Sequence, residues 1–373
     1  MKVAPILHEL RLRGVPHLFV HTGQHYDVQM SETLLNDLGA PQPDVLLEVG
    51  SATHAVQTAR TMERFEPVLL EHRPSWVVVV GDVNSTLACA LVTAKLRDEL
   101  ECKIAHVEAG LRSNNWSMPE EINRVLTDRL SDLLLTPSED ALANIALEGL
   151  NTARVTFVGN VMIDSLFHVL PKARMLGAPE RYGVIPGSYV LATLHRPSNV
   201  DRPGQLKTLL TALATISDEW PVLFPMHPRT KAKAESFALG SLLDRLIVTA
   251  PLGYTEMVAL MDGAVAVVTD SGGVQEETTV LGVPCVTVRE QTERPVTITH
   301  GTNRLVTWPP TVAGVLGDLQ KAVVRGRIPT GASSPPGWDG YAAARIVDAL
   351  LARALTPTRQ SGEASFSAQI AAS

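Results

Sequence analysis

The stretch Trp-Val-Val-Val-Val-Gly-Asp-Val-Asn-Ser-Thr at residues 76–86 decides the fold of this chain. Its first five residues are bulky and apolar, which is typical of a strand buried on both faces of a parallel sheet. Gly81 and Asp82 follow, and a helical pattern then covers residues 85–96. A strand followed by a helix is the repeating unit of α/β folds with parallel sheets.

This alternation occurs in two series, separated by a segment at 171–188 whose prolines and glycines are typical of a linker. The first series predicts strands at 16–21, 76–80, 103–107, 133–136 and 155–158. The second predicts strands at 189–194, 222–225, 246–249, 264–269 and 285–288. Helical patterns include 5–13, 85–96 and 122–131.

We therefore predict an α/β fold of two Rossmann-like, doubly wound domains that face a central cleft, where such folds bind ligands. The first domain covers residues 1–170 and the second 188–337. The tail at 356–373 is rich in Ser, Thr, Ala and Gln and has no apolar period, so we expect it to be disordered.

The composition excludes several classes of function. The chain has 373 residues, enough for two domains, and its net charge of -7 argues against a general binder of nucleic-acid backbones. Its three cysteines fit neither a disulfide framework nor a zinc site, and we expect them to be buried in a reducing compartment. With no apolar run long enough for a membrane and no signal peptide, we expect a cytoplasmic protein that does not bind membranes.

Several cofactor motifs are missing from the sequence. It contains no Gly-x-Gly-x-x-Gly turn in a first strand–helix unit, no Gly-x-x-x-x-Gly-Lys-Ser/Thr phosphate loop and no His-Glu-x-x-His helix. The eleven histidines are scattered without the spacing of metal ligands. We expect neither a bound cofactor nor a metal.

The sharpest local signal is Val-Val-Thr-Asp-Ser-Gly-Gly-Val-Gln-Glu-Glu at 267–277. A strand leads into Ser271, Gly272 and Gly273, and a helix then begins. Glycines let the backbone approach a ligand closely, and free amides at a helix start favour phosphate. A tight turn before a helix explains the pattern equally well. Glu277, in the first turn, either complements the helix dipole or accepts hydrogen bonds from ribose hydroxyls.

Three carboxylates belong to the first series. Asp82 and Glu108 directly follow predicted strands, and Glu120 follows Pro119 at a helix start. Ligands of open α/β sheets bind at the carboxyl ends of strands, so the three side chains can converge at one edge. Clustered carboxylates push one another's pKa values apart, which produces an acid and a base. Taken singly, Asp82 also fits a helix N-cap and Glu120 an ordinary helix opening.

Basic residues belong mainly to the second series. His195 and Arg196 follow the strand at 189–194, His227 follows the strand at 222–225, and Arg294 lies beyond the strand at 285–288. A His-Arg pair at a strand end is suited to hold a phosphate. A polar surface loop is the alternative for each of them.

Seven segments together resemble the UDP-N-acetylglucosamine 2-epimerase family, and they occur in the family's order over nearly the whole chain. They are Thr-Gly-Gln-His (22–25), Gly-Asp (81–82), His-Val-Glu-Ala-Gly-Leu-Arg (106–112), Pro-Glu-Glu-Ile-Asn-Arg (119–124), His-Arg-Pro (195–197), Asp-Ser-Gly-Gly-Val-Gln-Glu-Glu (270–277) and Thr-Glu-Arg-Pro (292–295). The resemblance implies a fold like the GT-B glycosyltransferases, a homodimer, and a C-terminal helix at about 338–355 that packs back on the first domain.

The resemblance also implies a reaction and the residues for it. A UDP-linked N-acetyl amino sugar would be inverted at C2 by elimination of UDP to a glycal and re-addition, as in the conversion of UDP-GlcNAc to UDP-ManNAc. Asp82, Glu108 and Glu120 would transfer protons, and His195 would stabilise the leaving diphosphate. The resemblance implies substrate binding by Lys2, Arg112, Ser271, Gly272, Gly273, Glu277 and Arg294.

A second nucleotide-sugar site occurs in many bacterial members of the family, and UDP-GlcNAc bound there activates the enzyme. Gln24, Arg196 and His227 match positions associated with that allosteric site. The pattern His-Arg-Pro-Ser-Asn-Val-Asp at 195–201 is typical of another branch, whose members also act on other UDP-sugars, including diacetamido uronic acids.

The start of the chain departs from the family, which begins with a strand and a Gly-Thr/Ala-Arg-Pro-Glu/Gln turn. Here only Lys2, Ala4 and Pro5 match the end of that stretch. We therefore expect Met1 to be an internal methionine of a longer natural product and the sheet to lack its central strand. Four alternatives remain open: a 2-epimerase of a UDP-diacetamido uronic acid, a hydrolysing epimerase, a GT-B glycosyltransferase and an inactive UDP-sugar binder.

Overall fold

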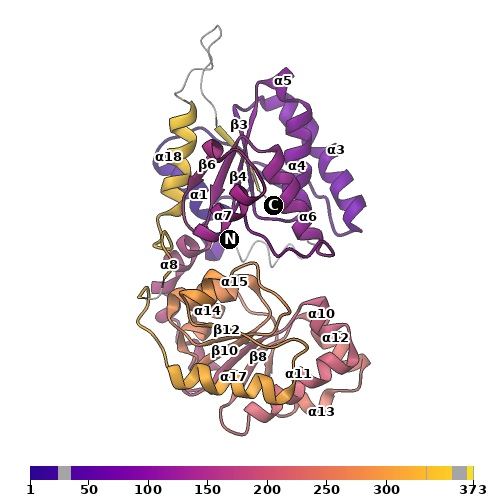
Figure 1. Ribbon diagram of the computed structural model, residues 1–373, viewed down its shortest axis with the longest axis vertical. Helices are drawn as coiled ribbons and strands as arrows, with labels where there is room; N and C mark the ends of the chain where they lie inside the picture. The colour runs from indigo at the N-terminus through magenta and orange to yellow at the C-terminus, as the bar shows by residue number, and fades with distance from the viewer. Residues whose placement is uncertain (24–34, 333, 355–367, 373) are drawn as a thin grey trace. The chain divides into compact units, whose positions relative to one another are not determined.

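A computed structural model describes residues 1–23, 35–332, 334–354 and 368–372 of the chain (Figure 1). The chain divides into two compact units. The first comprises Met1–Ser165 and Pro336–Ser373, and the second Leu166–Pro335. Each unit is a parallel sheet covered by helices.

The first unit contains a seven-stranded sheet in the order β2-β1-β13-β3-β4-β5-β6, in which all neighbours are parallel. The strands are β1 (Phe19–His21), β2 (Val45–Leu46), β3 (Trp76–Val80), β4 (Lys103–Val107), β5 (Leu133–Thr136), β6 (Val155–Phe157) and β13 (Ala368–Ala372). The main helices are α1 (Val3–Leu12), α3 (His54–His72), α4 (Asn84–Lys95), α6 (Pro119–Leu130), α7 (Glu139–Leu147) and α18 (Ala342–Ala354), with the short α5 (Arg97–Leu100) and η1 (Thr152–Arg154).

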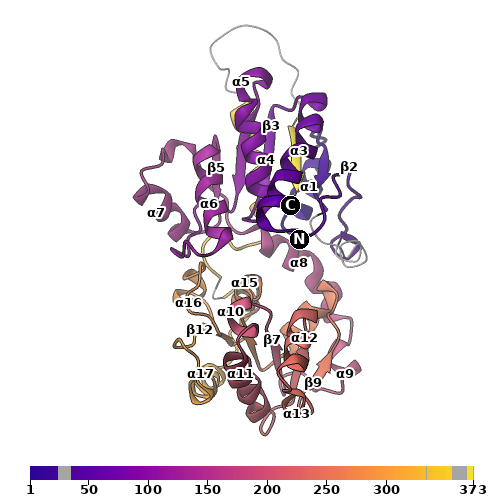
Figure 2. The ribbon, with the colours of Figure 1, turned by 90° about the vertical axis from the view of Figure 1, so that its right-hand side faces the viewer.

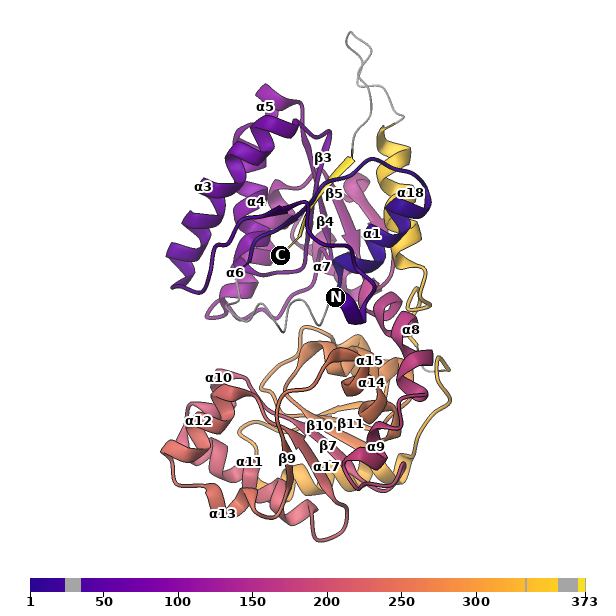
Figure 3. The ribbon, with the colours of Figure 1, turned by 180° about the vertical axis from the view of Figure 1, so that it is seen from behind.

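Two hydrophobic cores cover the two faces of this sheet. Val78 and Val80 of β3 pack with α1 and α18 on one face, while Val77 and Val79 pack with α3 and α4 on the other. Figure 3 shows the two pairs of helices on opposite sides of β3 and β4, and Figure 2 shows α7 beside β5. The continuous apolar run at 76–80 is therefore buried on both faces, as its sequence predicted.

The C-terminal residues correct one prediction. The tail at 356–373 was expected to be disordered, and the middle of the sheet to lack a strand. Instead β13 lies between β1 and β3, with Ile370 opposite both Phe19 and Val78. The short Ala-Gln-Ile-Ala-Ala segment carries no apolar period, and its strand conformation comes from backbone pairing on both edges. Residues 355–367 and 373 lie outside the described part of the chain.

The second unit contains a six-stranded parallel sheet in the order β12-β11-β10-β7-β8-β9. Its strands are β7 (Val190–Thr193), β8 (Val222–Pro225), β9 (Ile247–Thr249), β10 (Ala266–Thr269), β11 (Cys285–Thr287) and β12 (Asn303–Leu305). The winding reverses between β7 and β10, which makes this edge the topological switch point of a doubly wound sheet. The α/β fold with two doubly wound sheets is confirmed.

Helices cover both faces of the second sheet. α11 (Pro203–Ile216) and α17 (Val312–Arg325) pack on one face, and Figure 3 shows α14 (Tyr254–Gly263) and α15 (Gly272–Leu281) on the other. The remaining helices are α9 (Ala178–Arg181), α10 (Pro197–Val200), α12 (Pro228–Ser236), α13 (Gly240–Leu243) and α16 (Val296–Thr299). Cys89, Cys102 and Cys285 are buried free thiols, as predicted.

The segment at 171–188 is not a continuous linker. Helix α8 (Val161–Arg174) runs through Pro171, and α9 follows within the same segment. The change from one unit to the other falls inside α8, between Ser165 and Leu166. Val169 and Ala173 are each 1% exposed, so burial of this face outweighs the local cost of a proline in a helix.

Close backbone contact between β6 and the C-terminal part of the first unit gives a stability prediction. Gly159 has φ +85°, and a Cβ added there would lie 1.9 Å from the carbonyl oxygen of Gly337. Gly149 also has positive φ, but a Cβ there would meet nothing within 4 Å. We expect Gly159→Ala to lower the free energy of unfolding by roughly 3 kcal/mol more than Gly149→Ala. Urea unfolding measures the difference, and equal midpoints would contradict the contact.

Candidate functional site

The carboxyl ends of β3 and β4 bring two predicted site residues together. Val80 pairs with Val107, so Asp82 and Glu108 leave the sheet at the same edge. A Cβ built on Gly81 would lie 3.2 Å from the Lys2 ammonium nitrogen and 4.0 Å from Oε2 of Glu108. The Glu108 carboxylate therefore lies beside the backbone that carries Asp82.

Glu108 has the features of a strained functional residue. Its φ is +70°, in the left-handed region that glutamate rarely adopts, and it is only 4% exposed. Oε2 accepts a hydrogen bond from Lys2 Nζ at 2.5 Å. Oε1 is buried and has no hydrogen-bond partner among the residues that the structure describes. One oxygen of this carboxylate is thus neutralised by a cation, while the other lacks a protein donor.

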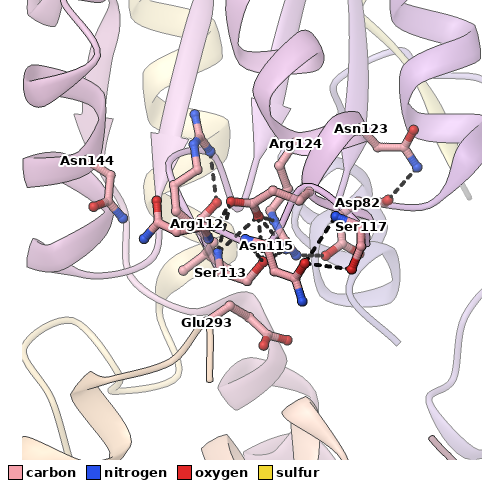
Figure 4. Close-up of polar contacts among 12 residues, drawn as sticks. Asp82, Arg112, Ser113, Asn115, Ser117, Asn123, Arg124, Asn144 and Glu293 are labelled. Carbon is pink, nitrogen blue, oxygen red and sulfur yellow. Dashed lines mark hydrogen bonds and ion pairs between the residues drawn. The ribbon is translucent and has the colours of Figure 1, made fainter. Parts of the chain in front are cut away.

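Helix α6 holds Asp82 from the other side. The guanidinium of Arg124 forms an ion pair with Oδ2 of Asp82, and Asn123 donates a hydrogen bond to the Asp82 carbonyl at 2.9 Å. Figure 4 shows Arg124 with its neighbours Asp82 and Ser113. Arg124 is 2% exposed and was not among the residues predicted for the site. Its contact with Asp82 spans 42 positions in the sequence, and no local pattern signals it.

The two glutamates that open α6 have different surroundings. Glu121 accepts backbone hydrogen bonds from Ser113 and Asn114 and pairs with Arg124. Burial alone would raise its pKa, but these donors outweigh it, and the pKa of Glu121 lies below its usual range. Glu120 is half-buried and forms no hydrogen bond or ion pair within the described ranges. Glu121 is therefore structural, and Glu120 is available for chemistry on the helix that holds Asp82.

Arg112 differs from the prediction that it binds substrate. Its side chain is 3% exposed and pairs with Glu148 at 2.6 Å and with Asp128 at 2.8 Å. It also donates to the Leu111 carbonyl. Because these internal acceptors engage all three guanidinium nitrogens, Arg112 stabilises the fold around the site instead of contacting a ligand. Sequence spacing could not reveal this, because Glu148 lies 36 residues away.

In the second unit, Asp270 organises the edge between β7 and β10. It is fully buried and accepts hydrogen bonds from the backbone amides of His195 and Arg196 and from the Asn199 side chain. Nδ1 of His195 lies 2.9 Å from Oδ1 of Asp270. Burial would raise the pKa of Asp270, but His195 and the other donors hold it below its usual range. The His195 ring is thereby fixed through Nδ1, and its side chain is 41% exposed.

The start of α15 follows β10 directly. Ser271 is the N-cap residue, and its amide donates to the Thr269 hydroxyl at 2.9 Å. A Cβ on Gly272 would lie 3.2 Å from Oε1 of Glu293, so this position favours glycine. The first amides of a helix lack partners within it, and they suit an anion. The predicted Ser271–Gly273 turn thus has the local geometry of a phosphate site.

Glu276 and Glu277 lie in α15 but differ in their partners. Glu276 pairs with Arg294 at 2.7 Å, and Arg294 also pairs with Glu293 at 2.9 Å. Glu277 instead accepts a hydrogen bond from the Tyr254 hydroxyl at 2.7 Å. Burial raises the pKa of Glu277 to about 8, and the charge of Glu276 adds to the shift. Arg294 was predicted to pair with phosphate, whereas here its partners are carboxylates.

The residues predicted for an allosteric site are only partly described. The rings of His195 and His227 lie 6.0 Å apart, and His227 caps α12 by accepting the Arg229 amide. Burial, together with the charge of His195, lowers the pKa of His227. Arg196 Nη2 lies 3.8 Å from Glu293. Gln24 lies outside the described residues.

Two searches of the described residues bear on the kind of site. They contain no group of three or more His, Cys, Asp or Glu side chains arranged to hold a metal ion. None of their helices is long and apolar enough to cross a membrane. The chemistry of the site is accordingly argued from carboxylates, histidines and arginines.

The raised pKa of Glu277 gives a pH-dependence prediction. Between pH 4.5 and 8 the folded chain binds more protons at this residue than the unfolded chain, so the contribution of Glu277 to stability falls as pH rises. We expect Glu277→Gln to gain stability over the wild type between pH 5 and 8.5, by at most about 5 kcal/mol. Thermal unfolding across pH measures this. The exposed Glu219→Gln is the control, and a gain that does not change with pH would contradict the assignment.

Comparisons with known proteins agree with this geometry. A sequence model described as UDP-N-acetylglucosamine 2-epimerase matches residues 8–351. The UDP-N-acetylglucosamine 2-epimerase of Methanocaldococcus jannaschii is 40% identical over 314 residues, covering 82% of this chain and 85% of that protein. The UDP-2,3-diacetamido-2,3-dideoxy-D-glucuronate 2-epimerase of Pseudomonas aeruginosa is 44% identical over 293 residues, or 78% and 79% of the two chains.

A solved structure gives the same result for the fold. The crystal structure of the Methanocaldococcus jannaschii UDP-GlcNAc 2-epimerase in complex with UDP-GlcNAc and UDP superimposes with a TM-score of 0.84. It is 36% identical and covers 94% of this chain and 96% of that chain. The matched family model spans the strand-end carboxylates of the first unit and the Ser-Gly-Gly turn of the second. This chain belongs to the UDP-N-acetylglucosamine 2-epimerase family.

Proposed function

We propose that this enzyme interconverts UDP-N-acetylglucosamine and UDP-N-acetylmannosamine by inverting C2 of the sugar. The observation that carries the proposal is the pair of strand-end carboxylates in the first unit. Asp82 is paired with a buried arginine, whereas Glu108 is buried beside Lys2 with one oxygen that has no protein donor among the described residues. Two carboxylates in such different surroundings are suited to opposite proton-transfer roles.

The reaction needs a proton acceptor and a proton donor at C2. A base removes the C2 proton, the C1–O bond breaks with its electrons leaving on UDP, and a C1=C2 double bond forms. A proton then reaches C2 on the opposite face, and an oxygen of UDP bonds to C1 again. The two protonic groups must lie on opposite faces of the sugar ring, which a single carboxylate cannot provide.

We assign the remaining roles from the chemistry of each residue. Asp82, Glu108 and Glu120 transfer protons, and Lys2 acts through Glu108 by keeping that carboxylate charged. The Ser271–Gly273 turn and His195 hold the diphosphate, since helix-start amides and an imidazole fixed through Nδ1 both favour developing negative charge. Glu277, oriented by Tyr254, binds the ribose hydroxyls. Arg294 pairs with phosphate when it exchanges a carboxylate partner for the ligand.

A second substrate is supported by one relative. The Pseudomonas aeruginosa protein with 44% identity is named for a UDP-diacetamido uronic acid. The same elimination and re-addition at C2 applies to that sugar, because its C1 and C2 chemistry is unchanged. Parallel assays with both UDP-sugars discriminate between the two substrates by the ratio of their kcat/KM values.

Three further properties belong to this proposal. We propose a homodimer in a reducing, cytoplasmic compartment, to which the three buried free thiols are suited. We also propose that UDP-GlcNAc activates the enzyme at a second site that includes Arg196 and His227. The contact between the His195 and His227 rings supports a coupling between diphosphate binding and that site.

Proton NMR with UDP-N-acetylglucosamine in deuterated buffer tests the reaction. We expect deuterium at C2 together with the UDP-linked mannosamine epimer, because the base must exchange its proton with solvent. Free N-acetylmannosamine with UDP would instead indicate a hydrolysing enzyme. Glycosyl transfer would leave C2 unlabelled, and binding without exchange of either UDP-sugar would indicate a binding protein and contradict the proposal.

A substitution at Glu108 tests its proposed role. We expect Glu108→Gln to lower kcat by roughly 10²–10⁴-fold, because an amide cannot take the C2 proton. UDP binding should be retained, since the nucleotide is assigned to other residues. Glu139→Gln is the control, because Glu139 is an exposed glutamate in the first turn of the neighbouring helix α7. Equal kcat values for the two variants would remove Glu108 from the mechanism.

A further inference from the structure

Asp128 is a buried aspartate of α6 that has no part in the roles assigned above. It is 0% exposed and lies on the same helix face as Glu121 and Arg124, because the three are spaced by three and four residues. This face of α6 points toward the carboxyl ends of β3 and β4, since Arg124 reaches Asp82 from it. Asp128 lies one turn further along the same face.

Asp128 uses both carboxylate oxygens on the loop that follows β4. Oδ1 lies 2.6 Å from Nδ1 of His106. Oδ2 accepts the Gly110 amide at 3.0 Å and the Arg112 guanidinium at 2.8 Å. Burial would raise the pKa of Asp128, but the charge and hydrogen bond of His106, followed by those of Arg112, hold it below its usual range. Asp128 is therefore a carboxylate with four-way acceptor geometry filled from one loop.

His106 extends this contact to the neighbouring strand. Its Nε2 lies 2.8 Å from the carbonyl oxygen of Gly81. A carbonyl oxygen only accepts, so Nε2 carries a proton, and the ionised Asp128 requires a proton on Nδ1 as well. His106 thus donates to both partners. The result is a continuous chain of hydrogen bonds from the Gly81 carbonyl through His106 and Asp128 to the Gly110 amide.

The two ends of this chain flank the proposed proton-transfer residues. Gly81 directly precedes Asp82, and Gly110 lies two residues after Glu108. The buried charges are balanced, since the imidazolium and Arg112 face Asp128 and Glu148. Asp128 makes these contacts entirely within the protein, so it would act on the reaction only through its neighbours.

The backbone of Glu108 explains why such a support is needed. A glutamate at φ +70° keeps this conformation only when the chain is fixed on both sides. β4 fixes the side before Glu108 through its pairing with β3, and the Gly110 amide bonded to Asp128 fixes the side after it. Without Asp128 the carboxylate would be free to move relative to Asp82.

We propose that Asp128 is a positioning residue of the epimerase, which sets the spacing between Asp82 and Glu108 through His106 and Gly110. The inference rests on the proposed C2 epimerisation. Two proton-transfer groups held at a fixed spacing remove and deliver the proton in balance. Loosening one end of the chain changes this balance without changing how UDP is bound.

Two variants and one matched control test the proposal. Asp128→Asn removes the charge from the centre of the chain, and His106→Gln breaks only the branch to Gly81. Asp132→Asn is the control, because Asp132 also accepts a β4 amide, that of Ile104 at 2.8 Å, and pairs with Arg97. Those contacts lie near the opposite end of β4. If Asp128→Asn fails to fold, His106→Gln carries the test, because it leaves the contacts of Asp128 with Gly110 and Arg112 intact.

The measurements are kcat, KM, and the ratio of C2 deuterium exchange to epimer formation in deuterated buffer. We expect both variants to lose at least tenfold in kcat with KM within threefold, and to change the exchange-to-epimer ratio at least threefold. Asp132→Asn should keep the wild-type ratio and kcat. The double variant should lose less than the product of the two single losses, because both act through one chain.

The ratio separates positioning from a merely structural role. Loss of folded enzyme lowers exchange and epimerisation equally and leaves their ratio unchanged, so a wild-type ratio in His106→Gln would overturn the inference. A ratio altered equally in Asp132→Asn would overturn it as well. If the wild-type enzyme itself shows no exchange at C2 of either UDP-sugar, the proposed function fails and the inference falls with it.

Discussion

The parallel pairing of β3 with β4 is the constraint on which the site of the first unit depends. Val80 lies opposite Val107, so the chain leaves both strands at the same level and Asp82 emerges beside Glu108. Their proximity comes from the register of the sheet, and register is fixed because β3 is buried on both faces. Helix α6 then adds the cation that neutralises Asp82 and carries Glu120. A slip of one residue would separate all of these groups.

Both units use a buried carboxylate to hold a loop that carries function. Asp270 accepts the amides of His195 and Arg196, and Asp128 accepts the amide of Gly110. A buried charge is tolerated only when hydrogen bonds and an opposite charge surround it. The same requirement makes each of these carboxylates specify a single loop conformation, since any other arrangement would leave the charge without partners.

Neighbouring glutamates in each unit show how environment separates chemically identical groups. Glu121 accepts backbone amides and an arginine, which lowers its pKa, while Glu120 beside it stays half-buried. Glu276 pairs with Arg294, while burial raises the pKa of Glu277 to about 8. Successive residues of a helix point about 100° apart, so one faces the charged interior of the site and the other a different neighbour. Membership of a 2-epimerase family is consistent with this separation of proton affinities.

The sequence by itself determined the elements with strong local signals and the order of the motifs along them. The strands at 76–80, 103–107 and 133–136 agree with the structure to the residue, because continuous apolar runs between turns define a buried strand locally. Only the tertiary structure decided that Arg112 is internal, that α8 continues through Pro171 and that residues 368–372 pair within the sheet. It alone also joined Asp128 to His106. These outcomes depend on partners distant in the sequence, and the free energy of burying a charge or pairing a strand depends on those partners and not on the residue's neighbours.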